Sequence, residues 1–268
     1  MKRLHNGILA MTGAALAMAG MTACGGNNDD KNGISFESFS FSEVADGADS
    51  DSLRNVIDDF DGRWSVHTDG VLPTRLGKGD IDFLRDSLCN LAGVEIVEGK
   101  LCEALPAELT PLDTKTVADS VRGTTPKSEY INQLSVDLLT PKLAVFHNYT
   151  YSYPEGAAHG MSVNSYVNYD IQKGEIVTLN RLFTAGFEKL LLPAIRKKLE
   201  DSGVELLVEP EEVKMPQQFR ITSSGVEFIY GLYEIAPYAE GEPTVMFYSS
   251  ELSSILTPAG KTLLLGGE

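Results

Sequence analysis

Hydrophobic and polar residues alternate through much of the second half of the chain. The segments INQLSVDLLT, LAVFHNYTYSY and MSVNSYVNYDI each have the length of a strand and are separated by turn residues. Three consecutive strands with short connections predict an antiparallel meander. Further along, FRITSSGVEFIY predicts a hairpin that turns at Ser223 to Gly225, and TVMFYS predicts a last strand. Near the start of the chain, ISFESFSFSEV predicts a first strand.

Helical spacing of apolar residues occurs in two places. The segment GDIDFLRDSLCNLAG has an aspartate, Asp80, that can accept hydrogen bonds from free N–H groups, and Gly93 can end the helix. A second apolar face runs from Phe187 to Leu199, where Pro193 predicts either a kink or a helix that begins near Leu192. Together these patterns indicate an α+β fold in which a meander and a hairpin pack with a few helices in two subdomains.

The first residues of the chain have the pattern of a bacterial export signal. A basic start is followed by an apolar stretch and then by Met-Thr-Ala-Cys at residues 21–24. This tetrapeptide resembles the lipobox of bacterial lipoproteins, in which the cysteine carries the lipid. We therefore expect a signal peptide at residues 1–23, lipidation of Cys24 with palmitate among its acyl chains, and a polar tether at residues 24–33. The predicted location is the cell envelope, as an outer-membrane lipoprotein that is periplasmic or surface-exposed. A plain secretory signal with a coincidental cysteine is the alternative.

The chain is strongly acidic. Its formal net charge is −16, and loss of residues 1–23, which include Lys2 and Arg3 but no acid, would change this to −18. Such a charge opposes binding to nucleic acid and favours a cationic partner. The alternative is that an acidic surface serves only solubility.

Cys89 and Cys102 form an even pair once Cys24 is assigned to the lipid. A disulfide between them would close a loop of about 14 residues and stabilise the fold by roughly 3 kcal/mol. Two free thiols are the alternative. The chain has no CxxC motif.

Recognisable catalytic and metal-binding motifs are absent from the sequence. Of the histidines beyond the signal, His67, His147 and His159, none belongs to a zinc motif, so no metal or cofactor is expected. His147 shares one face of a predicted strand with Tyr149, Tyr151 and Tyr153, which could bind sugar rings or a protein. The alternative is that these rings only pack beneath a helix. The small residues around His159 indicate a turn.

Three motifs occur in order: YSYPEGAAHG, YVNYDIQKGEIVTLNRLF and a long C-terminal segment that contains YEIAPYAEG. Together they resemble the C-terminal domain family of RsiV, the lysozyme-sensing anti-sigma factor. The matching positions are Gly156, Ala158 and His159 in the first motif; Asp170, Gly174, Thr178, Leu179, Leu182 and Phe183 in the second; and Tyr233, Glu234, Ile235, Ala236, Pro237, Tyr238 and Gly241 in the third. Ala157 replaces a glycine of the family pattern.

The resemblance implies a mixed sheet-and-helix domain at residues 145–256 and a location in the cell envelope. Residues 34–144 then form a separate N-terminal α+β domain, and residues 257–268 form a tail. The regulatory function of RsiV is not implied, because that protein has a cytoplasmic sigma-binding segment and a transmembrane helix.

We therefore expect a non-catalytic, lipid-anchored envelope protein that binds a protein or glycan ligand, with a lysozyme-like muramidase or peptidoglycan as the leading candidates. The residues expected to bind the ligand are His159, Tyr233, Glu234 and Tyr238. One alternative is a cell-wall hydrolase that pairs His159 with Asp170 or Glu234. Another is a structural envelope lipoprotein, which would have no pocket and one exposed apolar patch.

Overall fold

The computed structural model describes residues 33–46, 63–103, 128–153 and 157–266. The predictions for the signal peptide and for Cys24 lie outside these ranges. The strands are β1 (Ile34–Asp46), β2 (Arg63–Leu76), β3 (Val94–Val97), β4 (Lys100–Glu103), β5 (Ser128–Leu139), β6 (Leu143–Tyr153), β7 (Met161–Asp170), β8 (Glu175–Ile176), β9 (Gln218–Ile221), β10 (Gly225–Ile229) and β11 (Thr244–Tyr248). The helices are α2 (Asp82–Ala92), α4 (Leu179–Leu182), α5 (Glu188–Ser202), α6 (Ser249–Leu252) and α7 (Pro258–Leu264). No helix within the described ranges is long and apolar enough to span a bilayer.

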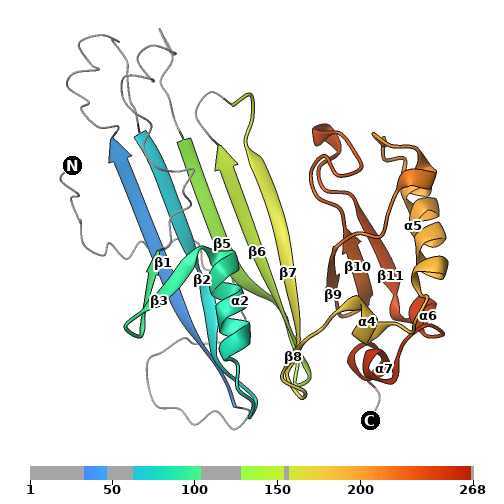
Figure 1. The fold of residues 1–268 in the computed structure, drawn as a ribbon, viewed down its shortest axis with the longest axis horizontal. Helices are drawn as coiled ribbons and strands as arrows, with labels where there is room; N and C mark the ends of the chain where they lie inside the picture. The colour runs from blue at the N-terminus through green and yellow to red at the C-terminus, as the bar shows by residue number, and fades with distance from the viewer. Residues whose placement is uncertain (1–32, 47–62, 104–127, 154–156, 267–268) are drawn as a thin grey trace.

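Six strands form one large sheet in the order β1-β2-β5-β6-β7-β8 (Figure 1). Strands β5, β6 and β7 are successive and antiparallel, which confirms the predicted meander. β2 and β5 pair in parallel, and the connection between them includes α2. A small antiparallel sheet, β11-β10-β9, follows in the C-terminal part and contains the predicted hairpin. The fold is therefore α+β, as the sequence predicts.

α2 packs against one face of the large sheet (Figure 1). It forms where the sequence predicts, because Asp80 accepts a hydrogen bond from the N–H of Asp82 and Gly93 adopts a left-handed conformation at the other end. Two buried sheet amides, Asn132 and Asn148, donate to the carbonyl of Leu91 in its last turn. The core beneath the helix contains Phe39, Leu72, Leu76, Leu84, Leu88, Leu134 and Phe146.

A second core joins the large sheet to the C-terminal elements. Because side chains alternate along a strand, β6 sends Ala144 and Phe146 toward α2 and sends Leu143 and Val145 toward the C-terminal part. There they pack with residues of the small sheet and of α5. α5 continues through Pro193 and ends at Gly203, which is left-handed. The predicted domain boundary between residues 144 and 145 falls inside β6, so strands from both sides of it form one sheet.

Side chains join β7 of the large sheet to β9 of the small sheet. The amide of Asn168 on β7 donates to the carbonyl of Phe219 at 2.9 Å and accepts from the N–H of Ile221 at 2.7 Å. Both partners lie on β9, the edge strand of the small sheet. In return, the side chain of Gln218 accepts from the N–H of Tyr166 on β7 at 3.2 Å. One carboxamide from each of these two strands thus takes the place that a neighbouring strand's peptide group would fill.

Two predictions for particular segments are corrected by the structure. Residues 257–268 were expected to form a tail, but α7 forms there because Thr257 caps it by accepting from the N–H of Gly260. The expected disulfide is not present, since Cys89 and Cys102 are both free thiols. Cys89 is buried in the core beneath α2, and Leu101 on β4 packs toward that core. Because successive side chains of a strand point to opposite faces, Cys102 points to the other side of β4.

Candidate functional site

Three of the predicted site residues come together at one place. The hydroxyl of Tyr233 lies 3.0 Å from Nε2 of His159, and the ring of Tyr238 stacks on the imidazole with 4.1 Å between ring centroids. The hydroxyl of Tyr238 donates to the carbonyl of Gly160 at 3.0 Å. We call His159, Tyr233 and Tyr238 the aromatic cluster. Its members come from a turn before β7 and from the loop at residues 231–242.

The loop that carries the two tyrosines is fixed at its base and in its middle. At its base, the N–H of Tyr230 donates to the carbonyl of Pro243 at 2.9 Å. In the middle, Ile235 and Ala236 are buried in the second core, and the N–H of Leu207 donates to the carbonyl of Ile235. The two tyrosines on either side of this anchor remain exposed, at 47% for Tyr233 and 36% for Tyr238.

The backbone of Tyr233 has φ of +62°, a left-handed conformation that is rare for a bulky residue. This conformation costs on the order of 1–2 kcal/mol relative to an ordinary one. The strained backbone sends an exposed aromatic side chain toward His159. Strain of this kind concentrates at sites that bind or react.

Tyr151 on β6 connects the cluster to the large sheet. Its ring lies against the backbone of Gly160, where a Cβ would come within 2.3 Å of the ring and its hydroxyl. Any residue larger than glycine would require the Tyr151 ring to shift. Burial raises the pKa of Tyr151, and the negative charge of Glu129 raises it further. The phenol therefore stays neutral and can act as a hydrogen-bond donor.

A polar link holds the end of the same loop to β7. Glu242 accepts from the backbone N–H of Asn164 at 3.2 Å and from the side-chain amide of the same residue. The carbonyl oxygen of that amide lies 2.6 Å from Nε2 of His147 on β6. His147 in turn stacks on Tyr166 with 4.7 Å between ring centroids. The sequence offered no signal for the link, because Glu242 lies 78 residues from Asn164.

Two carboxylates that the sequence proposed as partners of His159 have other contacts. Asp170 ends β7, which begins at Met161 next to the cluster, so the two ends lie about 30 Å apart along the strand. Its carboxylate binds Arg181 and the N–H groups of a turn. Glu234 is exposed in the loop, and its carboxylate accepts from the N–H of Gly231 at 2.8 Å. Within the described residues, the ring nitrogens of His159 bind Tyr233 and the carbonyl of Gly160.

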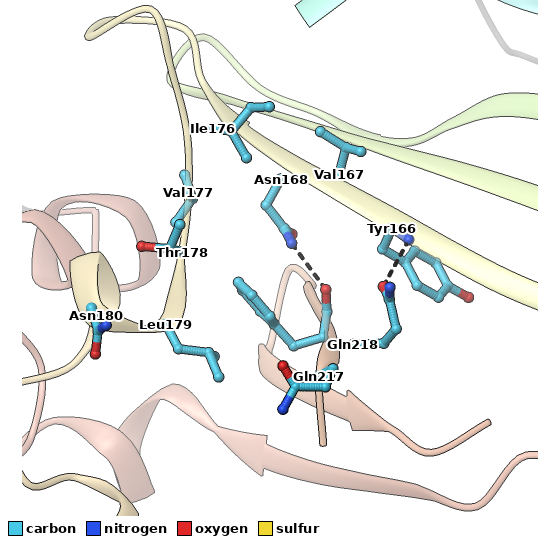
Figure 2. Close-up of a pocket in the computed structure, with 11 residues that line it drawn as sticks. Tyr166, Val167, Asn168, Ile176, Val177, Thr178, Leu179, Asn180, Gln217 and Gln218 are labelled. Carbon is cyan, nitrogen blue, oxygen red and sulfur yellow. Dashed lines mark hydrogen bonds between the residues drawn. The ribbon is translucent and has the colours of Figure 1, made fainter. Parts of the chain in front are cut away.

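A pocket of about 340 Å³ lies between β7 and β9, beside the bridge made by Asn168 (Figure 2). Its apolar floor includes Val177, Leu179 and Phe219. The polar groups around it are mainly hydroxyl and carboxamide groups, and the close-up shows those of Asn168, Thr178, Asn180, Gln217 and Gln218. Among the described residues that line it, none is an acid, a lysine, an arginine or a histidine. The sequence did not predict this pocket, because its two walls are about 50 residues apart.

The described residues contain no group of three acids, cysteines or histidines placed to hold a metal ion. The face of β6 that carries His147, Tyr149, Tyr151 and Tyr153 is the one opposite α2. These rings therefore do not pack beneath that helix. They lie on the side of the sheet where the aromatic cluster lies.

Comparison with known proteins finds a match in the C-terminal part of the chain. A family model described as "Protein of unknown function (DUF3298)" matches residues 180–247, which include the loop of the aromatic cluster. No curated protein matches the chain.

Two solved structures have a similar fold. A DUF3298 family protein from Pseudomonas aeruginosa PAO1 has 18% sequence identity and a TM-score of 0.56, over 84% of this chain and 95% of that one. A member of the same family from Bacteroides fragilis NCTC 9343 also has 18% identity, with a TM-score of 0.61, over 85% of this chain and 96% of that one. The chain thus shares a fold with DUF3298 proteins.

Proposed function

We propose that this protein is a non-catalytic recognition protein of the bacterial cell envelope that binds a basic protein ligand through the aromatic cluster. The observation that carries the proposal is the assembly of His159, Tyr233 and Tyr238. Two segments far apart in sequence meet there and present exposed rings on a rigid base. Tyrosines in such preorganised positions often supply most of the binding energy at protein interfaces.

Charge supports a cationic ligand. The loop at residues 231–242 contains Glu234, Glu240 and Glu242 but no lysine or arginine. The whole chain has a net charge of −16. Long-range electrostatic attraction would draw a basic protein to this surface, and its association rate would be higher at low salt than at high salt. The resemblance to RsiV makes a lysozyme-like muramidase the first ligand to test.

The envelope location rests on the sequence. In this proposal, residues 1–23 direct export and Cys24 receives the lipid, so that the folded part is tethered to the outer membrane. The tether at residues 24–33 would leave the aromatic cluster free to meet a ligand in the periplasm or outside the cell.

Peptidoglycan is a second candidate ligand, favoured by the pocket between β7 and β9. Its hydroxyl and carboxamide groups around an apolar floor suit the hydroxyl and acetamido groups on the sugar part of peptidoglycan. A muropeptide that occupies this pocket would contact Gln217 or Gln218. The two candidates therefore predict different residues at the contact.

Calorimetric titration of the full chain with a basic lysozyme, and separately with muropeptide fragments, tests the proposal at physiological salt. We expect lysozyme to bind, and we expect Tyr238→Ala to weaken binding at least tenfold. Tyr248→Ala is the matched control, because Tyr248 is 58% exposed at the far end of β11. Its affinity should stay within twofold of the unchanged chain. If lysozyme produced no heat while muropeptides did, and if Gln218→Ala abolished that heat, the second candidate would replace the first.

A further inference from the structure

The aromatic cluster is too small to form a stable protein interface by itself. A specific interface buries roughly 800 Å² on each partner. A fully buried tyrosine contributes about 150–250 Å², so two tyrosines that are half exposed supply on the order of 200 Å². If the cluster binds a protein, neighbouring surface must supply the rest.

The face of the large sheet opposite α2 adjoins the cluster. Strand register places Asp69, Gln133 and Tyr149 side by side in one row across β2, β5 and β6. A second row contains His67, Ile131 and Tyr151 in the same strands. Tyr151 belongs to this row and also lies against Gly160 of the cluster's turn. The sheet face and the cluster are therefore one continuous surface.

Three side chains of these rows, those of His67, Asp69 and Gln133, hold one another in place. Gln133 donates to Asp69 at 3.1 Å, and Nε2 of His67 lies 3.1 Å from the same carboxylate oxygen. The side chains of His67 and Asp69 are 45% and 37% exposed. Side chains that hold one another in place lose little freedom when a partner binds.

We infer that this face, which we call the platform (His67, Asp69, Ile131, Gln133, Tyr149 and Tyr151), is the second half of the binding surface for the basic protein proposed above. With strands about 4.8 Å apart, the three strands of the platform span about 10 Å, and the sheet face from β1 to β7 spans about 19 Å. The two rows contain no lysine or arginine, and they carry the carboxylate of Asp69, with Glu129 next to the second row on β5. The platform is thus negatively charged, as the loop at residues 231–242 is, and suits the same cationic partner. This inference rests on the proposed function, because it shares that ligand.

Three variants of the full chain test the platform with a basic lysozyme as the probe. Asp69→Asn keeps the size of the side chain and removes its charge, so the association rate at low salt should fall about three- to tenfold. Tyr149→Ala should weaken the affinity about tenfold. Glu95→Gln is the charge-matched control, because Glu95 is exposed on β3, on the α2 side of the sheet. Its association rate should stay within 1.5-fold of the unchanged chain.

The outcomes separate the two proposals. If the unchanged chain binds lysozyme, and if Tyr238→Ala weakens binding while Asp69→Asn and Tyr149→Ala leave it unchanged, the platform is overturned and the cluster stands. If the unchanged chain does not bind lysozyme, both proposals fail. Tyr149→Phe keeps the ring, so its affinity should stay near that of the unchanged chain. An equal loss in Tyr149→Phe and Tyr149→Ala, together with a lower melting temperature, would assign Tyr149 a structural role and overturn its part in the platform.

Discussion

Replacement of Asn168 by alanine should destabilise the protein more than the same replacement of an exposed asparagine or glutamine. Asn168 is only 2% exposed, and its side chain satisfies two groups on β9, the carbonyl of Phe219 and the N–H of Ile221. Alanine would leave both groups without their side-chain partner. Each unpaired buried group costs about 1–3 kcal/mol, so we expect the free energy of unfolding to fall by about 2–6 kcal/mol. That is a large part of the 5–15 kcal/mol typical of a domain.

Urea denaturation followed by circular dichroism measures this change. The midpoint should shift to lower urea, and hydrogen exchange should show faster opening of β9 than of β5 and β6, because the bridge between the two sheets has been cut. Asn180→Ala is the matched control, since Asn180 is an exposed amide at the rim of the same pocket. It should change the free energy of unfolding by less than 0.5 kcal/mol. A change below 1 kcal/mol in Asn168→Ala would refute the idea that this amide takes the place of a strand's peptide group.

Three further results are expected. Tyr233→Gly should weaken lysozyme binding in titration without lowering the melting temperature, because glycine relieves the left-handed backbone while the ring is lost; a clear drop in melting temperature would contradict the strain. Alkylation followed by mass spectrometry should modify Cys102 before Cys89, because burial raises the pKa of Cys89 and shields its thiol; failure of both thiols to react after unfolding without reductant would indicate a disulfide. Hydrogen bonding from the N–H of Tyr248 lowers the pKa of Glu251 below its ordinary 4.5, so its contribution to stability is present above that pH and is lost as the pH falls through the lowered value. Glu251→Gln should therefore flatten the acid side of the stability profile in thermal melts.

The sequence predicted the elements that depend on local pattern. The meander, the hairpin and α2 follow from alternation, helical spacing and capping residues, all of which act within about 15 residues. The aromatic cluster was found through a resemblance, since the motifs around His159 and Tyr233 pointed to one family. The sequence alone does not show that these residues contact one another, because their contact depends on tertiary packing.

Features that depend on distant segments were missed. Nothing near Asn168 indicates that its amide meets β9, because an asparagine at the end of a strand more often marks a turn. The parallel pairing of β2 and β5 was also missed, since neither strand's own pattern records the direction of its neighbour. The prediction of a disulfide was wrong for a simpler reason. The spacing of Cys89 and Cys102 allows a loop, but it does not record that Cys89 is buried in the core beneath α2 while Cys102 points to the other side of β4.

The parallel pair at the centre of the large sheet has a consequence for how the chain folds. Asp69 on β2 and Gln133 on β5 are 64 residues apart, whereas the β9–β10 and β6–β7 pairs are joined by short connections. Closing a long loop costs more chain entropy than closing a short one, and contacts between distant residues slow folding. The meander and the small sheet can therefore form early. We therefore expect the antiparallel pair of β1 and β2 to dock on β5 afterwards, and we expect this docking to limit the rate at which the complete sheet forms.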